Sequence, residues 1–180
     1  MNSKTDMIIE QARNIGITEI APLEIKTLEF EEWVRDTCKN SCRSYNTSWA
    51  CPPAVGTLEE CRLRCEGYSN MLLFNRKYDI EDSFDWEGMS FAMKDFKTTA
   101  IKLESLVGPS VGKLLVLVSE GCEKCKKCTY PEAPCRFPER LHHSLEGYGF
   151  NVSKLASKAG LHYIGGPNTI TYFGAILYNG

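Results

Sequence analysis

The sequence predicts an α/β or α+β fold: a single domain with a central mixed sheet, flanking helices and two cysteine-rich metal-binding loops at one edge. Segments with strand and helix patterns alternate along the chain, and most of the nine cysteines gather in two loops. A chain of 180 residues is long enough for one core and short for two domains. We therefore treat residues 1–180 as one cysteine-rich metal-binding domain.

Two helices and a strand are predicted before the first cysteine loop. Residues 6–14 and 28–37 carry apolar side chains on one helical face, and the second of these helices leads directly to Cys38. Loosely alternating β-branched residues favour a strand over 17–25. Residues 38–56 are rich in turn-forming residues, which predicts a loop.

A capping box marks the start of the next helix. Thr57 and Glu60 have the spacing at which each side chain satisfies a free backbone amide at a helix start. The helix should end near Gly67. An apolar stripe along it should be buried, so Cys65 is expected to be a small buried hydrophobe. The stripe consists of Leu58, Cys61, Cys65 and Tyr68.

One long amphipathic helix is predicted over 83–107, ended by Gly108 and Pro109. Its Met and aromatic stripe is typical of a core or a subunit contact, which leaves a homo-oligomer open. That stripe contains Trp86, Met89, Met93, Phe96, Ala100, Leu103 and Val107. The other elements expected here are strands at 70–79, 113–119 and 169–178 and short helices at 138–148 and 151–159.

The densest group of thiols follows the strand at 113–119. Cys122, Cys125 and Cys128 stand at three-residue intervals, as in a ferredoxin-type run, whose turns wrap the backbone around a cluster. Cys135 comes seven residues later and would complete this site or its neighbour. These spacings predict a [4Fe-4S] cluster.

A second set of thiols, Cys38, Cys42 and Cys51, lies far upstream. It needs a fourth ligand or leaves one iron open. Cys61 is the best fourth ligand, because the first turns of a helix favour a thiolate, but it also fits the apolar stripe. Two [4Fe-4S] clusters are therefore expected if the fold brings both segments together. Their ligands would be Cys38, Cys42, Cys51, Cys61, Cys122, Cys125, Cys128 and Cys135.

Zinc is the main alternative cofactor. Structural zinc sites usually use two separated pairs of ligands, so the triple run over 122–128 leaves one thiol awkward for a single tetrahedral ion. Ligand softness and spacing therefore favour iron–sulfur over zinc. Radical chemistry with S-adenosylmethionine is disfavoured, because Tyr45 stands where the CxxxCxxC signature needs its third cysteine.

Composition argues against several classes of function. An odd number of cysteines cannot all form disulfides, and clustered thiols in the cytoplasm usually bind metal. A formal net charge of -2 gives no basic surface for nucleic acid, and the apolar runs are too short to cross a membrane. The amino terminus lacks a signal-peptide pattern, so we expect a cytoplasmic protein.

Charged and aromatic residues near the loops suggest how a cluster would be tuned. Positive charge raises the reduction potential of a cluster and would dock an acidic redox partner protein, although a solvated lysine-rich loop is the simpler alternative. We expect Tyr45, Trp49 and Phe137 to shield the clusters. His142-His143 could give one ligand, but a surface pair beside a helix start is favoured. The basic residues are Arg43, Lys124, Lys126, Lys127, Arg136 and Arg140.

Two ordered motifs resemble a known family. They read Cys38-x3-Cys42-x2-Tyr45-x3-Trp49-x-Cys51-Pro52-Pro53 and Cys122-x2-Cys125-x2-Cys128-x6-Cys135-Arg136-x-Pro138, followed by Ser144-x-Glu146-x2-Gly149-x-Asn151-Val152. Over residues 30–178 the chain resembles a family of prokaryotic proteins predicted to bind metal and of unknown function. The resemblance implies a metal or iron–sulfur protein of bacteria or archaea without an assigned reaction. Cys61 and Cys65 fall outside the matched motifs.

Three functional hypotheses follow from these observations. The first is transfer of single electrons by two [4Fe-4S] clusters to or from a redox partner protein. The second is a zinc-stabilised interaction module, in which metal only folds the loops. The third is a redox enzyme with an open iron at the upstream cluster.

Overall fold

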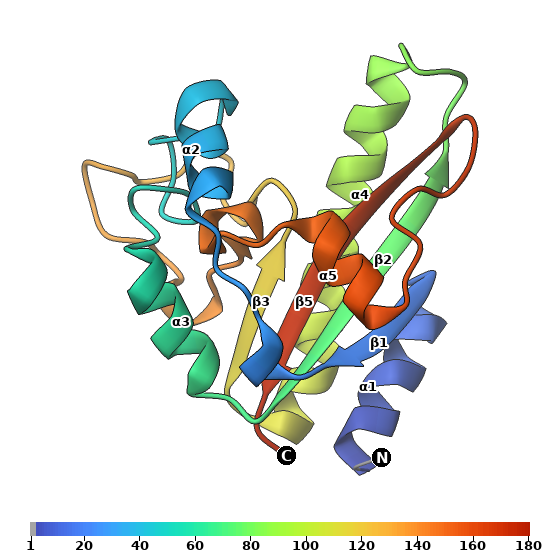
Figure 1. The fold of residues 1–180 in the computed structure, drawn as a ribbon, viewed down its shortest axis with the longest axis horizontal. Helices are drawn as coiled ribbons and strands as arrows, with labels where there is room; N and C mark the ends of the chain where they lie inside the picture. Colours follow the sequence, from blue (N-terminus) through green and yellow to red (C-terminus); the bar gives the residue numbers. More distant parts are fainter. Residues whose placement is uncertain (1–2) are drawn as a thin grey trace.

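A five-stranded mixed sheet forms the centre of the computed structural model, which describes residues 3–180 (Figure 1). The strand order is β1-β2-β5-β3-β4; all neighbours are antiparallel except β4, which runs parallel to β3. The predicted fold class is confirmed as a single-domain α+β fold. The strands are β1 (Glu19–Leu23), β2 (Asn70–Asp79), β3 (Leu114–Val118), β4 (His143–Ser144) and β5 (Thr169–Tyr178).

Helices cover both faces of the sheet (Figure 1). On one face lie α1 (Ser3–Asn14) and α4 (Trp86–Val111), and on the other α3 (Leu58–Glu66) and α5 (Val152–Ala159). Each face therefore has its own apolar core. The remaining helical elements are α2 (Glu32–Ser41) and the 3-10 turns η1 (Ile25–Thr27), η2 (Pro138–Arg140) and η3 (Glu146–Tyr148).

The strand β2 shows how burial on both faces produces a continuous apolar run. Met71 and Leu73 belong to the core on the α3 side, whereas Leu72 and Phe74 belong to the core on the α1 side. All four side chains are buried. Because successive residues of a strand point to opposite faces, a strand between two helical layers needs apolar residues at every position. The prediction of a strand at 70–79 is confirmed.

Local capping signals define α3 and α5 as expected. The Thr57 side chain accepts a hydrogen bond from the Glu60 amide, and the Glu60 carboxylate accepts one from the Thr57 amide, so the predicted capping box is present. At α5, Asn151 Oδ1 accepts a hydrogen bond from the Lys154 amide. Gly160 ends that helix with a φ of 69°.

The helix expected over 28–37 begins later, at Glu32. Leu28 is buried in the core, and the Glu31 amide donates to the Gly149 carbonyl oxygen at 2.9 Å, so this segment stays extended. Cys38 consequently lies inside α2 instead of following it. Tertiary contacts thus shift this helix along the chain.

The long helix α4 continues past the predicted end at Gly108 and Pro109. Pro109 falls in its last turn and has no amide to donate to the carbonyl oxygen of Ser105, but the buried Val111 extends the packing face of the helix beyond it. Trp86, predicted to be part of the apolar stripe, is 74% exposed at the first position of α4. Within residues 3–180, no helix combines the length and apolar character needed to span a bilayer.

The prediction of a short helix over 138–148 is wrong. The segment instead contains η2, the strand β4 and η3. Its amides bond to distant segments: the Ser144 amide donates to the Ala50 carbonyl oxygen at 3.1 Å, and the Leu145 amide to that of Val118 at 3.2 Å. These long-range hydrogen bonds replace the i to i−4 pattern of an α-helix. The segment therefore joins the upstream cysteine loop to the edge of the sheet.

Candidate metal centre

Four thiols of the downstream loop, Cys122, Cys125, Cys128 and Cys135, line one cavity of about 70 Å³. The loop leaves the end of β3 and returns to β4, so the sheet fixes both of its ends. Four cysteines that the spacing predicted to act together are thus brought together. Other residues of the wall are Ser48, Ala50, Lys124, Thr129, Arg136, Phe137 and Leu141.

Backbone amides point at two of these sulfur atoms. The Lys124 amide donates to Cys122 Sγ at 3.5 Å, and the Phe137 amide donates to Cys135 Sγ at 3.4 Å. Burial raises the pKa of Cys122, while the Lys124 amide, the His142 amide and the Lys124 charge act against that rise. Amides aimed at thiolate sulfurs are typical of iron–sulfur loops, where they tune the reduction potential.

Three thiols of the upstream segment gather on a second cavity, of about 520 Å³. Cys38 lies in α2, Cys42 is the residue that ends α2, and Cys51 lies in the following turn. Burial, helped by the charges of Glu146, Cys42 and Cys51, raises the pKa of Cys38 to about 11. The three thiols therefore lie within electrostatic range of one another.

Hydrogen bonds and a close approach join the two cysteine segments. Trp49 Nε1 donates to the Ala133 carbonyl oxygen at 3.0 Å, and the Tyr130 hydroxyl donates to Asn46 Oδ1 at 2.6 Å. The rings of Trp49 and Tyr130 meet edge to face, with centroids 5.0 Å apart. The expectation that the fold brings the two segments together is confirmed.

Two cysteines lie apart from both cavities. Cys61 and Cys65 are fully buried in the core on the α3 side, and the Cys61 thiol faces the Val55 carbonyl oxygen at 3.9 Å. Burial raises the pKa of Cys65 to about 12. The prediction that Cys65 is a buried small hydrophobe is confirmed. For Cys61, this placement agrees with the alternative that it simply belongs to the apolar stripe.

The expectation that His142 and His143 form a surface pair is wrong. His142 is buried, with its Nε2 atom 3.0 Å from Glu104 Oε2, because its side chain points toward α4. His143 is half-buried, and its Nδ1 atom is buried without a hydrogen-bond partner in residues 3–180. Burial lowers the pKa of His143 to about 3, helped by the charges of Arg64 and His142. Both rings are therefore structural side chains of the β4 segment.

Two ion pairs of opposite polarity attach the downstream loop to α4. Lys97 Nζ lies 3.0 Å from Glu123 Oε1, and Lys124 Nζ lies 2.5 Å from Glu104 Oε2. Lys97 and Glu104 are both buried although they are charged. Sequence reasoning missed Glu104. Its position four residues after Ala100, on the apolar face of a predicted helix, is the signal that could have found it.

The comparison with known families decides the identity of the chain at the family level. The family model described as "Predicted metal-binding protein (DUF2284)" matches residues 21–178. The chain belongs to this family. No curated protein and no solved structure matches it significantly. The DUF2284 description supports a metal-binding role and leaves the kind of metal and the reaction to the chemistry of the site.

The thiols of this DUF2284 protein surround cavities instead of converging on one point. Among residues 3–180, no three or more His, Cys, Asp or Glu side chains are grouped as the ligands of one metal ion. A single zinc ion would draw thiolate sulfurs to about 2.3 Å from itself, and so to about 4 Å from one another. The soft donors are four thiols at the downstream cavity and three thiols at the upstream one, where Glu120 and Glu146 also line the wall. Soft sulfur ligands suit iron–sulfur clusters, zinc and Cu(I).

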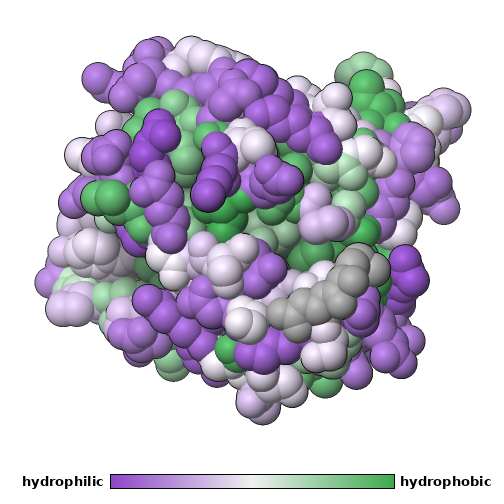
Figure 2. All heavy atoms as spheres, turned by 60° about the horizontal axis from the view of Figure 1, so that its bottom comes forward, coloured by the Kyte–Doolittle hydropathy of each residue, from purple (hydrophilic) through white to green (hydrophobic). Residues whose placement is uncertain are grey.

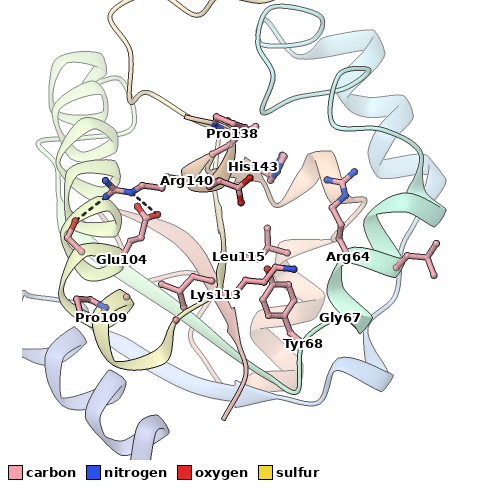
Figure 3. A pocket seen from close by; sticks show the side chains of 17 residues that line it. Arg64, Gly67, Tyr68, Glu104, Pro109, Lys113, Leu115, Pro138, Arg140 and His143 are labelled. Carbon is pink, nitrogen blue, oxygen red and sulfur yellow. Dashed lines mark hydrogen bonds and ion pairs between the residues drawn. The ribbon is translucent and has the colours of Figure 1, made fainter. Parts of the chain in front are cut away.

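A third cavity of this DUF2284 protein, of about 1010 Å³, is lined by no cysteine. It lies between α3 and the carboxyl-terminal end of α4, where Arg64 and Arg140 approach from opposite sides and Lys113 and Tyr68 lie near the middle (Figure 3). Arg140 faces Glu104, with Nε 3.5 Å from Oε1. Figure 2, in which the bottom of the view in Figure 1 has come forward, shows hydrophobic residues between hydrophilic ones on the surface. Since no thiol lines this groove, we do not assign the metal to it.

Proposed function

We propose that this protein holds two [4Fe-4S] clusters and passes single electrons to or from a redox partner protein in the cytoplasm. The observation that carries the proposal is the pair of adjacent thiol-lined cavities, one with four cysteines and one with three. They share a wall, since Ala50 lines the first cavity and Cys51 the second, next to Gly121. Two clusters on either side of one backbone segment would exchange electrons readily.

Two observations support a cluster over a single zinc ion at the downstream site. Its four thiols border one cavity, and three of them stand at the three-residue intervals of a ferredoxin-type run. Amides aimed at the sulfurs of Cys122 and Cys135 add the hydrogen bonds that iron–sulfur sites use. When bound, a [4Fe-4S] cluster supplies one-electron redox chemistry there.

Exposed basic side chains beside the downstream loop support docking of an acidic partner. Lys126, Lys127 and Arg136 are exposed, whereas Lys124 is engaged by Glu104. Positive charge on the outer face of a site that transfers electrons steers a negatively charged partner. The inner cation Lys124 serves to anchor the loop.

A redox enzyme with an open iron is the second candidate function. The observation that favours it is the upstream cavity, which brings three thiols together without Cys61 and leaves about 520 Å³ beside them. A cavity of this size accommodates a small molecule. In this candidate, Cys38, Cys42 and Cys51 would hold the cluster, which would offer an open iron for a bound molecule.

Metal and sulfide analysis of protein purified without oxygen tests the proposal. We expect a brown protein with about eight iron and eight acid-labile sulfide per chain. Cys125→Ala should remove about half of the iron and of the visible absorption. Cys65→Ala, which alters a buried thiol outside both cavities, should keep both and serves as the matched control. A colourless protein with stoichiometric zinc, or a Cys125→Ala protein with unchanged iron and colour, would overturn the proposal.

A further inference from the structure

The cavity beside the upstream thiols has the size and the lining of a small-molecule pocket. Its volume of about 520 Å³ falls in the range of roughly 300–1,000 Å³ that is typical of ligand sites. Cys38, Cys42 and Cys51 form one part of the wall. Apolar and aromatic side chains form much of the rest: Trp33, Val34, Phe150, Tyr163, Tyr172 and Phe173.

The ionisable side chains of this lining, apart from cysteine and tyrosine, are two glutamates, and burial raises the pKa of Glu146 to about 7. Glu120 follows β3 and Glu146 begins η3, and both line the cavity. In the described part of the chain, the lining contains no lysine, arginine or histidine, and neither glutamate forms an ion pair. Thiolates of a loaded metal site would add further negative charge. An anionic ligand would therefore be repelled.

Two cations whose charges reach residues of this lining are engaged elsewhere. Lys97, whose charge reaches Glu146, pairs with Glu123 at 3.0 Å. Arg35, whose charge reaches Cys38, donates to the carbonyl oxygens of Gly56 and Gly147, both at 2.8 Å. Neither side chain lines the cavity. The pocket therefore offers two carboxyl groups without a cation that faces them.

Aromatic rings at this pocket suit a cation as well. Trp33 is 54% exposed and Tyr163 is 49% exposed, and both residues line the cavity. The Tyr163 ring stacks on Phe173, with centroids 5.7 Å apart, which orients it. Ring faces attract organic ammonium groups, and carboxylates add direct charge pairing.

We propose that this cavity binds a small organic amine: an apolar or aromatic body with one positively charged nitrogen that faces Glu120 and Glu146. The inference deepens the second candidate function, the redox enzyme with an open iron. Only the role of the bound amine as a substrate at the upstream cluster rests on that function. The selectivity itself comes from the two carboxyl groups and the rings. Carboxylate and phosphate analogues of the same size are excluded.

Three indole compounds that differ in charge test the selectivity. Tryptamine is a cation at neutral pH, tryptophol is uncharged and indole-3-acetate is an anion. Titration calorimetry on anaerobically prepared protein should show tryptamine binding at least about tenfold more tightly than tryptophol, with no measurable binding of indole-3-acetate. Equal binding of tryptamine and indole-3-acetate, or no binding of tryptamine at millimolar concentration, overturns the inference.

Charge-removing variants locate the site. Glu120→Gln and Glu146→Gln should each weaken tryptamine binding about tenfold and leave tryptophol binding unchanged. Glu139→Gln, the same change in the large groove without thiols, is the control and should have no effect. Unchanged tryptamine binding in both Glu120→Gln and Glu146→Gln overturns the inference. If a variant fails to fold, the comparison of the three compounds on the unaltered protein still tests it.

Iron analysis of the same samples separates this inference from the proposed function. Iron present without a preference for tryptamine overturns the inference and leaves the proposed function standing. If protein without iron and sulfide still prefers tryptamine, the amine-binding inference stands and the iron–sulfur proposal fails.

Discussion

Gly121 lies so close to Cys51 that a Cβ atom at position 121 would be 3.0 Å from Cys51 Sγ. Gly121 immediately precedes Cys122, so at this point a single backbone segment separates the two sets of thiols. The φ of Gly121 is 74°, a conformation that favours glycine. The close approach of the two sets therefore depends on a residue without a side chain.

Gly121→Ala should destabilise the protein and disturb the upstream site. The backbone conformation alone should cost about 1 kcal/mol, and the contact with Cys51 should add to this cost by displacing its sulfur. We therefore expect a lower free energy of unfolding in chemical denaturation of metal-free protein. We also expect less iron per chain after anaerobic purification.

Gly160→Ala is the matched control for this change. Gly160 has a similar φ of 69°, but a Cβ atom there would meet nothing within 4 Å. This variant should lose about 1 kcal/mol and keep its full iron content. Equal losses of stability and of iron in the two variants would show that the approach to Cys51 is unimportant.

Replacement of Cys61 distinguishes a buried thiol from a metal ligand. Because Cys61 is packed in the core and does not line the upstream cavity, Cys61→Ala should retain the iron content of the unaltered protein and lose about 1–2 kcal/mol of stability. Cys38→Ala should instead lose about half of the iron. If iron per chain falls by half in Cys61→Ala, Cys61 is the fourth ligand that its helix position suggested.

Elements with strong local signals could be predicted from the sequence. The capping box of Thr57 and Glu60 and the Asn151 cap depend on residues three positions apart, so the chain itself specifies them. The strands β2 and β5 were predicted over their full lengths, because strands buried on both faces need long apolar runs. The grouping of the four downstream thiols also follows from spacing within one loop.

Features that depend on distant partners could not be predicted in this way. Residues 138–148 have a helix-like pattern, but their amides bond to Ala50 and Val118, which only the folded chain brings near. His142 appeared to be a surface residue because its partner Glu104 lies 38 residues away. The separation of Cys61 from the upstream thiols is likewise a tertiary property, since helix position alone favoured it as a ligand.

Glu104 should make the protein sensitive to acid. Burial by itself would raise the pKa of Glu104, but hydrogen bonds from His142 and Lys124 outweigh it and lower the pKa to about 2. Burial lowers the pKa of His142, so His142 donates as a neutral ring and Lys124 supplies the charge. A lowered carboxyl pKa stabilises the fold above the unfolded value of 4.5, and this contribution is lost as the pH falls from 4.5 toward 2.

Glu104→Gln should therefore cost about 3 kcal/mol at pH 7 and much less at pH 3. Denaturant unfolding of both proteins at the two pH values measures the difference. Glu59→Gln removes a carboxylate from an exposed pair with Arg62 and should change stability little at either pH. A deficit in Glu104→Gln that is the same at pH 7 and pH 3 would contradict a role for the ionised carboxylate.

Tyr130→Phe should loosen the downstream loop from the upstream one. It removes the hydrogen bond between the Tyr130 hydroxyl and Asn46 Oδ1 and keeps the ring against Trp49. The bond is exposed, so we expect a loss of only about 0.5–1 kcal/mol in global stability. Local opening of the loop should rise more visibly, and trypsin should cleave after Lys126 or Lys127 several times faster.

Two control variants show how fast trypsin should cleave the loop when its contacts are intact. Asn46→Asp keeps an acceptor oxygen and tolerates the φ of 58° at this position, so its loop should be cleaved at the rate of the unaltered protein. Tyr68→Phe removes a hydroxyl that makes no hydrogen bond within residues 3–180 and should also leave the rate unchanged. If Tyr130→Phe is cleaved no faster than these two, the hydroxyl does not hold the loops together. The contacts of Trp49 with Ala133 and with the ring of Tyr130 would then be sufficient to keep the two thiol-lined cavities side by side.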